Sequence, residues 1–304
     1  MGLLSKWVES LDFDYHILPA CTRLVSPRSH CEQCVLACEV NAVKIKKGIP
    51  SINHNKCLEC GHCISACPVQ AVAGIYPQRT IIQNQLVIKD ERIPTTKELL
   101  ILYKKGVKVV ISESPTLLKL CEGSINKANI LLEQLGEDLV SSCVKSVREE
   151  EYFSRRELFA FWALESKSVA KQVAPAKWRF NQNDFNLPKY YPDYQFAKIT
   201  IDIEKCSLCN TCKKLCKKDC FEINEGKFTI SSQGCSMCNL CVDTCPQKAI
   251  MVEEQISNEE KTILPIFQTT CESCNKTVYS LSEKEEECIA CRKRKSFLNQ
   301  SMLS

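Results

Sequence analysis

The 304-residue chain lacks the long apolar segments that membrane-spanning and exported proteins carry. No stretch approaches the roughly 18 consecutive apolar residues that suggest a transmembrane helix. The first residues show no basic start followed by a long apolar core, so no export signal is predicted there. Their apolar side chains recur at helical spacing and predict an amphipathic helix over residues 1–20. We therefore expect a cytoplasmic, reducing compartment, in which cysteines bind metals instead of forming disulfides.

The patterns of common enzyme classes are also scarce. Residues 81–150 contain neither G-x-G-x-x-G nor G-x4-G-K-[ST], so no nucleotide site is predicted there. The histidines, His16, His30, His54 and His62, are not paired with acidic residues at a catalytic spacing. The sequence therefore favours a function other than that of an enzyme in its own right.

The chain instead contains 23 cysteines, most of them in regular runs. The most complete run, Cys235–Pro246, has the spacing C-x2-C-x2-C-x3-C-P. A [4Fe-4S] cubane needs four thiolates, and cysteines at intervals of three let one tight loop wrap a cluster. Cys57–Pro68 has the same spacing, and Cys206–Cys216 has it without a following proline. Structural zinc is the alternative, but cysteines at this spacing before a proline favour the cluster.

The two halves of the chain repeat each other at a constant offset of 178 residues. The equivalent cysteines are Cys31, Cys34 and Cys38 with Cys209, Cys212 and Cys216, and Cys57–Pro68 with Cys235–Pro246. Gly48 corresponds to Gly226, which predicts a hairpin turn between the two runs of each half. The repeat therefore predicts two modules, residues 21–80 and residues 198–258, each with two cluster sites.

Both modules resemble bacterial-type ferredoxins that bind two [4Fe-4S] clusters, over about 60 residues each. In that family the last cysteine of a run binds the neighbouring cluster, so the resemblance implies crossed ligation. The implied ligand sets are Cys21, Cys31, Cys34 and Cys67 (cluster 1); Cys38, Cys57, Cys60 and Cys63 (cluster 2); Cys206, Cys209, Cys212 and Cys245 (cluster 3); and Cys216, Cys235, Cys238 and Cys241 (cluster 4).

Cluster 1 departs from the family pattern at its first ligand. The position three residues before Cys31 is Arg28, whose guanidinium stays protonated and cannot bind iron. Cys21 is the nearest spare thiol and is the candidate for the fourth ligand. The alternatives are a [3Fe-4S] cluster on three cysteines, a cluster with a labile iron, or a lost site. In those cases Cys21 would be a small buried hydrophobic residue.

Residues 81–150 predict a small α/β insert, because strand and helix patterns alternate there. The expected elements are a strand over Ile81–Ile88, a capped helix over Thr95–Lys104, a strand over Val107–Ile111 and either one helix or a broken pair of helices over Pro115–Leu135. Cys121 and Cys143 of the insert, like Cys220 of the second module, are expected to be buried hydrophobic residues. Residues 151–197 predict a helix opened by a capping box at Ser154, followed by an irregular linker.

Residues 265–295 contain two C-x2-C pairs, Cys271 with Cys274 and Cys288 with Cys291. Their spacing resembles a zinc ribbon, in which two pairs hold one tetrahedral ion and the segment between them forms a hairpin. Rubredoxin-like iron or a small iron–sulfur site is the alternative. The basic run Arg292–Lys295 is expected to be a solvated charge run, and residues 296–304 form a tail.

Together these patterns predict an α+β protein, in which two ferredoxin-like modules, each with two [4Fe-4S] sites, flank a small α/β insert and precede a zinc ribbon. The predicted function is single-electron transfer with redox protein partners, as a subunit or partner of a larger oxidoreductase, without a small-molecule substrate. The alternatives are a redox sensor whose ribbon binds nucleic acid, and an oxidoreductase with a substrate site in the insert.

The charge of the chain does not favour a nucleic-acid partner. The apoprotein has a formal charge of +4 and a pI near 8.1. Four clusters and one zinc site, each held by four thiolates, would each add about −2 and bring the holoprotein near about −6.

Overall fold

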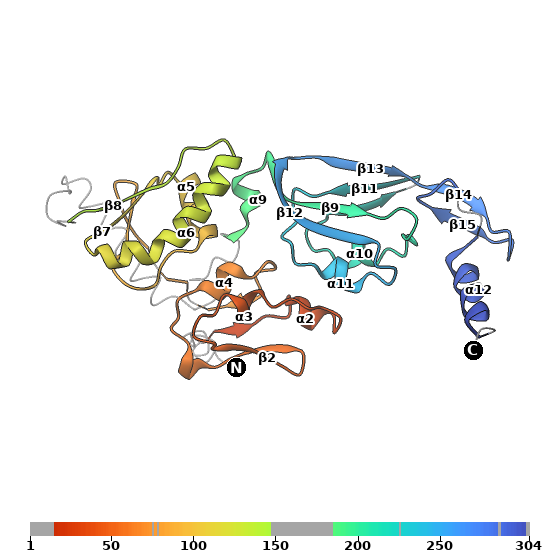
Figure 1. The fold of residues 1–304 in the computed structure, drawn as a ribbon, viewed down its shortest axis with the longest axis horizontal. Coiled ribbons are helices and arrows are strands. Elements are labelled where there is room, and N and C mark those ends of the chain that lie inside the picture. Colours follow the sequence, from red (N-terminus) through yellow and green to blue (C-terminus); the bar gives the residue numbers. More distant parts are fainter. Residues whose placement is uncertain are drawn as a thin grey trace, which may run out of the picture. The chain divides into compact units, whose positions relative to one another are not determined.

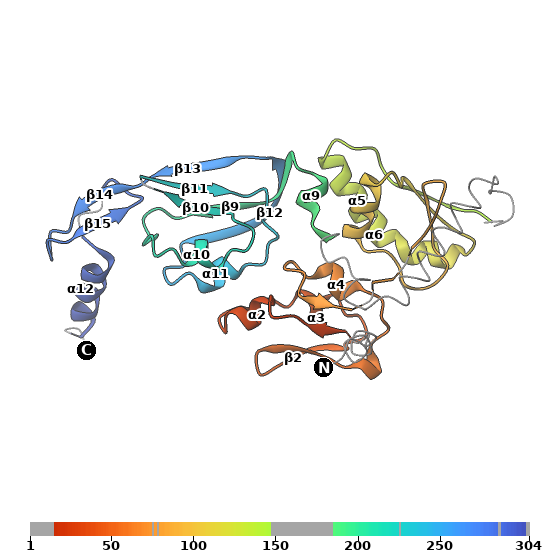
Figure 2. The same ribbon diagram turned by 180° about the vertical axis from the view of Figure 1, so that it is seen from behind.

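The computed structural model describes residues 15–74, 76–77, 79–146, 185–224, 226–284 and 287–301, with side chains described to residue 295. The chain divides into two compact units (Figures 1 and 2). The first comprises Met1–Pro27 and Glu32–Tyr190, and the second comprises Arg28–Cys31 and Tyr191–Ser304. Most of the predicted N-terminal helix, and the predicted helix at Ser154, lie outside the described residues. Where the description begins, residues 16 and 17 form a strand, so the helix prediction is wrong for this part.

The first unit opens with the predicted module of two cysteine runs. Its elements are β1 (His16–Ile17), α2 (Thr22–Val25), α3 (Gln33–Leu36), β2 (Val43–Lys46), β3 (Ile49–Ile52), the 3-10 helix η1 (His54–Lys56), α4 (His62–Ala66) and β4 (Val72–Ala73). β2 and β3 pair antiparallel across a two-residue turn, and β1 pairs antiparallel with β4. Both turn residues, Lys47 and Gly48, have positive φ, as a hairpin turn matched to strand twist requires. The predicted hairpin is confirmed.

The insert is a mixed four-stranded sheet with two long helices. The sheet order is β5 (Thr80–Ile82), β6 (Gln85–Val87), β7 (Val109–Ser112) and β8 (Ser141–Val144). The pairs β6–β7 and β7–β8 are parallel, and they are connected by α5 (Thr96–Lys104) and α6 (Pro115–Gln134). Both helices begin as predicted, because the Thr95 and Ser114 hydroxyls cap the first turn by accepting N–H bonds of 3.2 and 3.4 Å.

The single strand predicted over Ile81–Ile88 is wrong. Gln83 and Asn84 both have positive φ, so this segment turns back as the tight β5–β6 hairpin. The alternating pattern that suggested one strand therefore belongs to two short strands.

A buried ion pair joins the insert to the first module. Glu98 on α5 accepts bonds from Arg79 Nε (2.7 Å), Arg79 Nη2 (2.9 Å) and the Tyr76 hydroxyl (2.6 Å). The side chains of Arg79 and Glu98 are only 11% and 7% exposed. Because a bidentate pair has one preferred geometry, it fixes the segment after β4 against α5.

The second unit repeats the module with longer strands. α9 (Leu187–Tyr190) ends the first unit. The second unit then contains β9 (Tyr194–Ile201), α10 (Thr211–Leu215), β10 (Phe221–Asn224), β11 (Lys227–Ser231), α11 (Leu240–Thr244), β12 (Ile250–Asn258) and β13 (Lys261–Pro265). β9 pairs with β12, and β10, β11 and β13 form a second antiparallel sheet. The predicted boundaries at 198 and 258 are too narrow, because the paired strands begin at Tyr194 and continue to Pro265.

The C-terminal segment forms a hairpin and a helix, although not in the predicted arrangement. β14 (Phe267–Thr270) pairs with β15 (Thr277–Ser280), so the hairpin encloses the first cysteine pair. The prediction that a hairpin fills the space between the two pairs is therefore wrong. α12 (Ile289–Ser301) includes the basic run and extends into the predicted tail. No helix among the described residues combines the length and apolarity needed to cross a membrane.

Candidate iron–sulfur and metal sites

The three complete cysteine runs share an uncommon backbone conformation. In each C-x2-C-x2-C loop, the residues on both sides of the second cysteine have positive φ. These residues are Glu59 and Gly61, Leu208 and Asn210, and Met237 and Asn239. Left-handed backbone is rare and strained for residues such as Leu and Met, so its repetition indicates a demand of the loop itself.

A second motif follows the last cysteine of all four runs. The third residue after that cysteine has positive φ in every case: Asn41, Gln70, Asp219 and Lys248. The next backbone N–H donates to the cysteine sulfur, from Ala42 to Cys38 (3.2 Å), Ala71 to Cys67 (3.1 Å), Ala249 to Cys245 (3.4 Å) and Cys220 to Cys216. An N–H bond to sulfur favours the thiolate, the form in which cysteine binds metal.

Two cavities of the second unit group its cysteines across the runs. The first cavity is lined by Cys206, Cys209, Cys212 and, from the other run, Cys245. The second is lined by Cys235, Cys238, Cys241 and, from the first run, Cys216. Each cavity thus groups three cysteines of one run with the last cysteine of the other, which is the crossed arrangement that the ferredoxin resemblance implied.

The donor sets of both cavities fit a group that carries positive charge. Burial, followed by the neighbouring thiols Cys206 and Cys209, raises the pKa of Cys212 to about 11. Burial, followed by Cys238 and Cys235, also raises the pKa of Cys241. Thiolates crowded beside apolar residues such as Phe228 and Ile250 repel one another strongly, because little solvent screens their charges. Bound iron would offset this repulsion.

The first module brings together the corresponding thiols of its second run. Burial raises the pKa of Cys63 to about 12, and Cys60, Cys57, Cys34 and Cys38 add to the increase as like charges. Cys38 also raises the pKa of Cys57, after burial and the Cys60 charge. The sulfurs assigned to cluster 2 are therefore close neighbours, and Cys34, assigned to cluster 1, lies near them.

Cys21 has a place in the backbone hydrogen bonding similar to that of Cys206, although its N–H bond spans three residues and that of Cys206 spans four. Leu18 N donates to Ala71 O (2.8 Å), and Cys21 N donates back to Leu18 O (3.0 Å). In the second unit, Asp202 N donates to Ala249 O (2.8 Å), and Cys206 N donates back to Asp202 O (3.0 Å). Ala71 and Ala249 are equivalent in the repeat, so Cys21 follows its anchoring strand as Cys206 does. Cys21, Cys34 and Cys67 also pack against the same hydrophobic core.

The loop between Cys21 and Cys34 differs from the other three. Glu32, the equivalent of the left-handed Asn210, has a φ of −131°, and His30, the equivalent of Leu208, is not in the positive-φ region. The short helix α2 is inserted between Cys21 and Cys31. The change at Arg28 is therefore part of a rebuilt loop and is not a single substitution.

The position of Cys220 beside the proposed ligands is not predicted by the sequence pattern. Cys220 is buried as predicted, at 2% exposed, but it lines the same cavity as Cys216 and Cys235. Hydrogen bonding between its thiol and their sulfurs raises the pKa of Cys220 and lowers that of Cys216 to about 6. The Cys220 thiol also donates to Lys218 O at 3.7 Å. The repeat could have revealed this position, because the fourth residue after the last cysteine is alanine in the other three runs, at Ala42, Ala71 and Ala249, and cysteine only here.

The two cysteines of the insert have different surroundings. Cys121 on α6 is 0% exposed, which confirms the prediction of a buried residue. Cys143 is exposed, so the same prediction for it is wrong. It lies on β8, the last strand in the sheet order, where all four residues are exposed.

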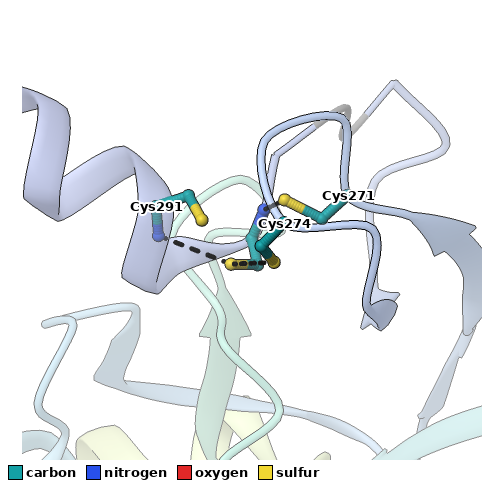
Figure 3. A group of neighbouring side chains, drawn as sticks. Cys271, Cys274 and Cys291 are labelled. Carbon is teal, nitrogen blue, oxygen red and sulfur yellow. Dashed lines mark hydrogen bonds between the residues drawn. The ribbon is translucent and has the colours of Figure 1, made fainter.

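The four C-terminal cysteines form a compact metal-binding group (Figure 3). Their sulfurs all lie within 4.8 Å of one another, and Cys274 Sγ and Cys288 Sγ are 3.9 Å apart. The first pair lies in the turn between β14 and β15, and the second pair lies where α12 begins. Backbone N–H donors, with that of Cys288 (3.3 Å) first, lower the pKa of Cys271 to about 6.

These spacings fit a single tetrahedral ion. Zinc–sulfur bonds of about 2.3 Å place ligand sulfurs about 3.8 Å apart, close to the observed separation. A [4Fe-4S] cubane would need its ligand sulfurs farther apart, so one ion suits this site better than a cluster does.

Comparison with known proteins identifies an iron–sulfur domain within the first module. Residues 28–71 match the family of 4Fe-4S dicluster domains. An uncharacterised ferredoxin of Methanocaldococcus jannaschii is 40% identical over 47 residues, which are 14% of this chain and 31% of that protein. The match therefore spans about a third of the relative's length. On this evidence the chain contains an iron–sulfur domain of the ferredoxin type.

Proposed function

We propose that the protein transfers single electrons through four [4Fe-4S] clusters. The observation that carries the proposal is the pair of cavities in the second unit, each lined by three cysteines of one run and the last cysteine of the other. A bound cluster of this type accepts and returns one electron, and its potential depends on burial, net charge and hydrogen bonds to sulfur.

The ligand sets are those that the resemblance implied. For clusters 3 and 4 the two cavities support them. For cluster 2 the raised pKa values of Cys57 and Cys63, to which the nearby Cys60 and Cys38 thiols contribute after burial, support the set. For cluster 1 we propose Cys21 as the fourth ligand because its backbone bonding matches that of Cys206. Cys31 enters this set on its spacing from Cys34.

Close spacing within each pair favours transfer between clusters. Cys212 and Cys216 line different cavities, yet they are joined by the single turn of α10. A helix rises about 1.5 Å per residue, so the two ligands are separated by about 6 Å along its axis. Each module therefore acts as a two-centre conductor.

The proposal also covers the C-terminal metal site and the setting in which the protein works. The C-terminal cysteines hold a structural zinc ion that stabilises the β14–β15 hairpin against α12. The protein works in a reducing, cytoplasmic compartment as a subunit or partner of a larger oxidoreductase, and this last assignment rests on analogy with other multi-cluster chains.

Metal analysis tests the proposal directly. Protein purified without oxygen should contain about 16 iron, about 16 sulfide and one zinc per chain, and dithionite should produce the EPR signals of interacting reduced clusters. Eight iron or fewer would refute the two-module assignment. Loss of iron, and not of zinc, from a variant lacking Cys271 and Cys274 would refute the zinc assignment.

A further inference from the structure

The first unit has an open groove beside the β2–β3 hairpin whose lining contains no acidic residue. The positively charged lining residues are Lys44, Lys46 and Lys56, and the polar ones include Asn41, His54 and Asn55. The three lysine side chains are exposed, and none has an ion pair within the described part of the chain. Their positive charges therefore face solvent and can attract an acidic partner.

The fold itself does not require this charge. At the repeat offset, Lys44 corresponds to Glu222, Lys46 to Asn224, and Lys56 to Gly234. The turn residue Lys47 likewise corresponds to Glu225. The two hairpins share their register, with Val43 opposite Ile52 in one and Phe221 opposite Ile230 in the other. Two copies of one hairpin have thus acquired opposite charge, which indicates a task that is specific to the first copy.

The groove adjoins two ligands proposed for cluster 2. Ala42 forms part of its wall, and the backbone N–H of Ala42 donates to Cys38 Sγ at 3.2 Å. At the other end, Lys56 directly precedes Cys57. A molecule held in the groove would therefore lie beside cluster 2.

From this position and charge we propose that the groove docks the acidic surface of a one-electron carrier protein, beside cluster 2. The inference rests on the proposed electron-transfer function. The lysines are exposed and spread over β2 and η1, as suits a broad acidic surface and not an enclosed small anion. Complementary charge accelerates encounter between redox proteins and is weakened by salt. In the reaction the reduced carrier loses one electron and a [4Fe-4S]²⁺ cluster gains it.

The test uses the full-length holoprotein and reduced flavodoxin, an acidic one-electron donor, as the probe. In flavodoxin the hydroquinone is oxidised to the semiquinone while the clusters are reduced, and stopped-flow absorbance follows both. The double variant Lys44→Glu/Lys46→Glu is compared with Lys119→Glu/Lys127→Glu, which makes the same charge change on exposed positions of α6. The salt concentrations are about 50 and about 500 mM, which correspond to Debye lengths of about 14 and about 4 Å.

We expect the groove variant to react about tenfold more slowly than the wild type at low salt and at nearly the wild-type rate at high salt. The α6 variant should stay within about twofold of the wild type at both. Equal slowing in both variants would show a general charge effect, and no slowing in either would show no docking here. Both results would overturn the proposal.

Two further measurements separate this proposal from the function on which it rests. Dithionite needs no docking site, so it should reduce the clusters equally in all three proteins. If the wild type lacks clusters or dithionite cannot reduce them, the electron-transfer function itself fails. If an oligonucleotide binds the wild type and not the groove variant, while flavodoxin rates are unchanged, the groove serves nucleic acid and the docking proposal is wrong.

Discussion

The assignment of Cys21 to cluster 1 can be tested by replacing it with alanine. The structure gives this cysteine the backbone bonding of Cys206, while the family position is occupied by Arg28. If Cys21 is the fourth ligand, Cys21→Ala leaves three thiolates for four iron atoms, so one iron has no protein ligand. We expect that corner to be lost, which converts cluster 1 to a [3Fe-4S] cluster and lowers the iron content from about 16 to about 15. Complete loss of the cluster would lower it to about 12.

The assay combines iron content with EPR of the oxidised protein, in which a [3Fe-4S] cluster is paramagnetic and a [4Fe-4S]²⁺ cluster is silent. Cys121→Ala is the matched control, because Cys121 is fully buried in the insert and lies in no proposed ligand set. The control should keep about 16 iron even if it lowers stability. Unchanged iron content and a silent EPR spectrum in Cys21→Ala would refute the assignment, and so would a [3Fe-4S] signal in the wild type.

Three more predictions follow from the other sites. Cys245→Ala should damage cluster 3 first and leave cluster 4 with its four ligands, so EPR should show the loss of coupling between them. If the Cys235–Cys241 cluster is lost first, crossed ligation is wrong. Cys220→Ala should retain about 16 iron but lower the potential of cluster 4, because it removes a hydrogen-bonding thiol beside two ligand sulfurs. A redox titration measures this, and Ala is already the residue at the three equivalent positions. Cys274→Ser should release the single zinc without loss of iron and should expose the β14–β15 hairpin to proteolysis. Loss of iron from this variant would contradict a separate zinc site.

The cysteine spacing predicted most of the candidate sites because cluster geometry dictates it. Four thiolates around one cubane leave the loop little conformational freedom. Positive φ therefore recurs at the same two loop positions in all three complete runs. The repeat offset predicted both hairpins for a similar reason, since a two-residue turn ending in Gly48 or Gly226 tolerates few alternatives. Local chemistry therefore determines the features that the sequence reveals best.

Long-range pairing explains what the sequence did not reveal. The equivalence of Cys21 and Cys206 appears only in backbone bonds to Ala71 and Ala249, because an insertion has changed the spacing between cysteines. The partner strand of β15 could not be predicted for the same reason. The sequence of Thr277–Ser280 does not indicate whether this strand pairs with the preceding or the following segment. The error at Ile81–Ile88 has a local cause, because Gln83 and Asn84 form a tight turn without glycine.

The single-turn helix α10 has a consequence for how the holoprotein is built. Its two ends contribute Cys212 to one cavity and Cys216 to the other, and α11 has the same relation to Cys241 and Cys245. If the two proposed clusters bind there, assembly of the first should order both helices and thereby position thiols that belong to the second site. Metal binding and folding are coupled in such sites. The two clusters of a module should therefore be inserted cooperatively, and maturation should produce empty and fully loaded modules with few half-loaded ones.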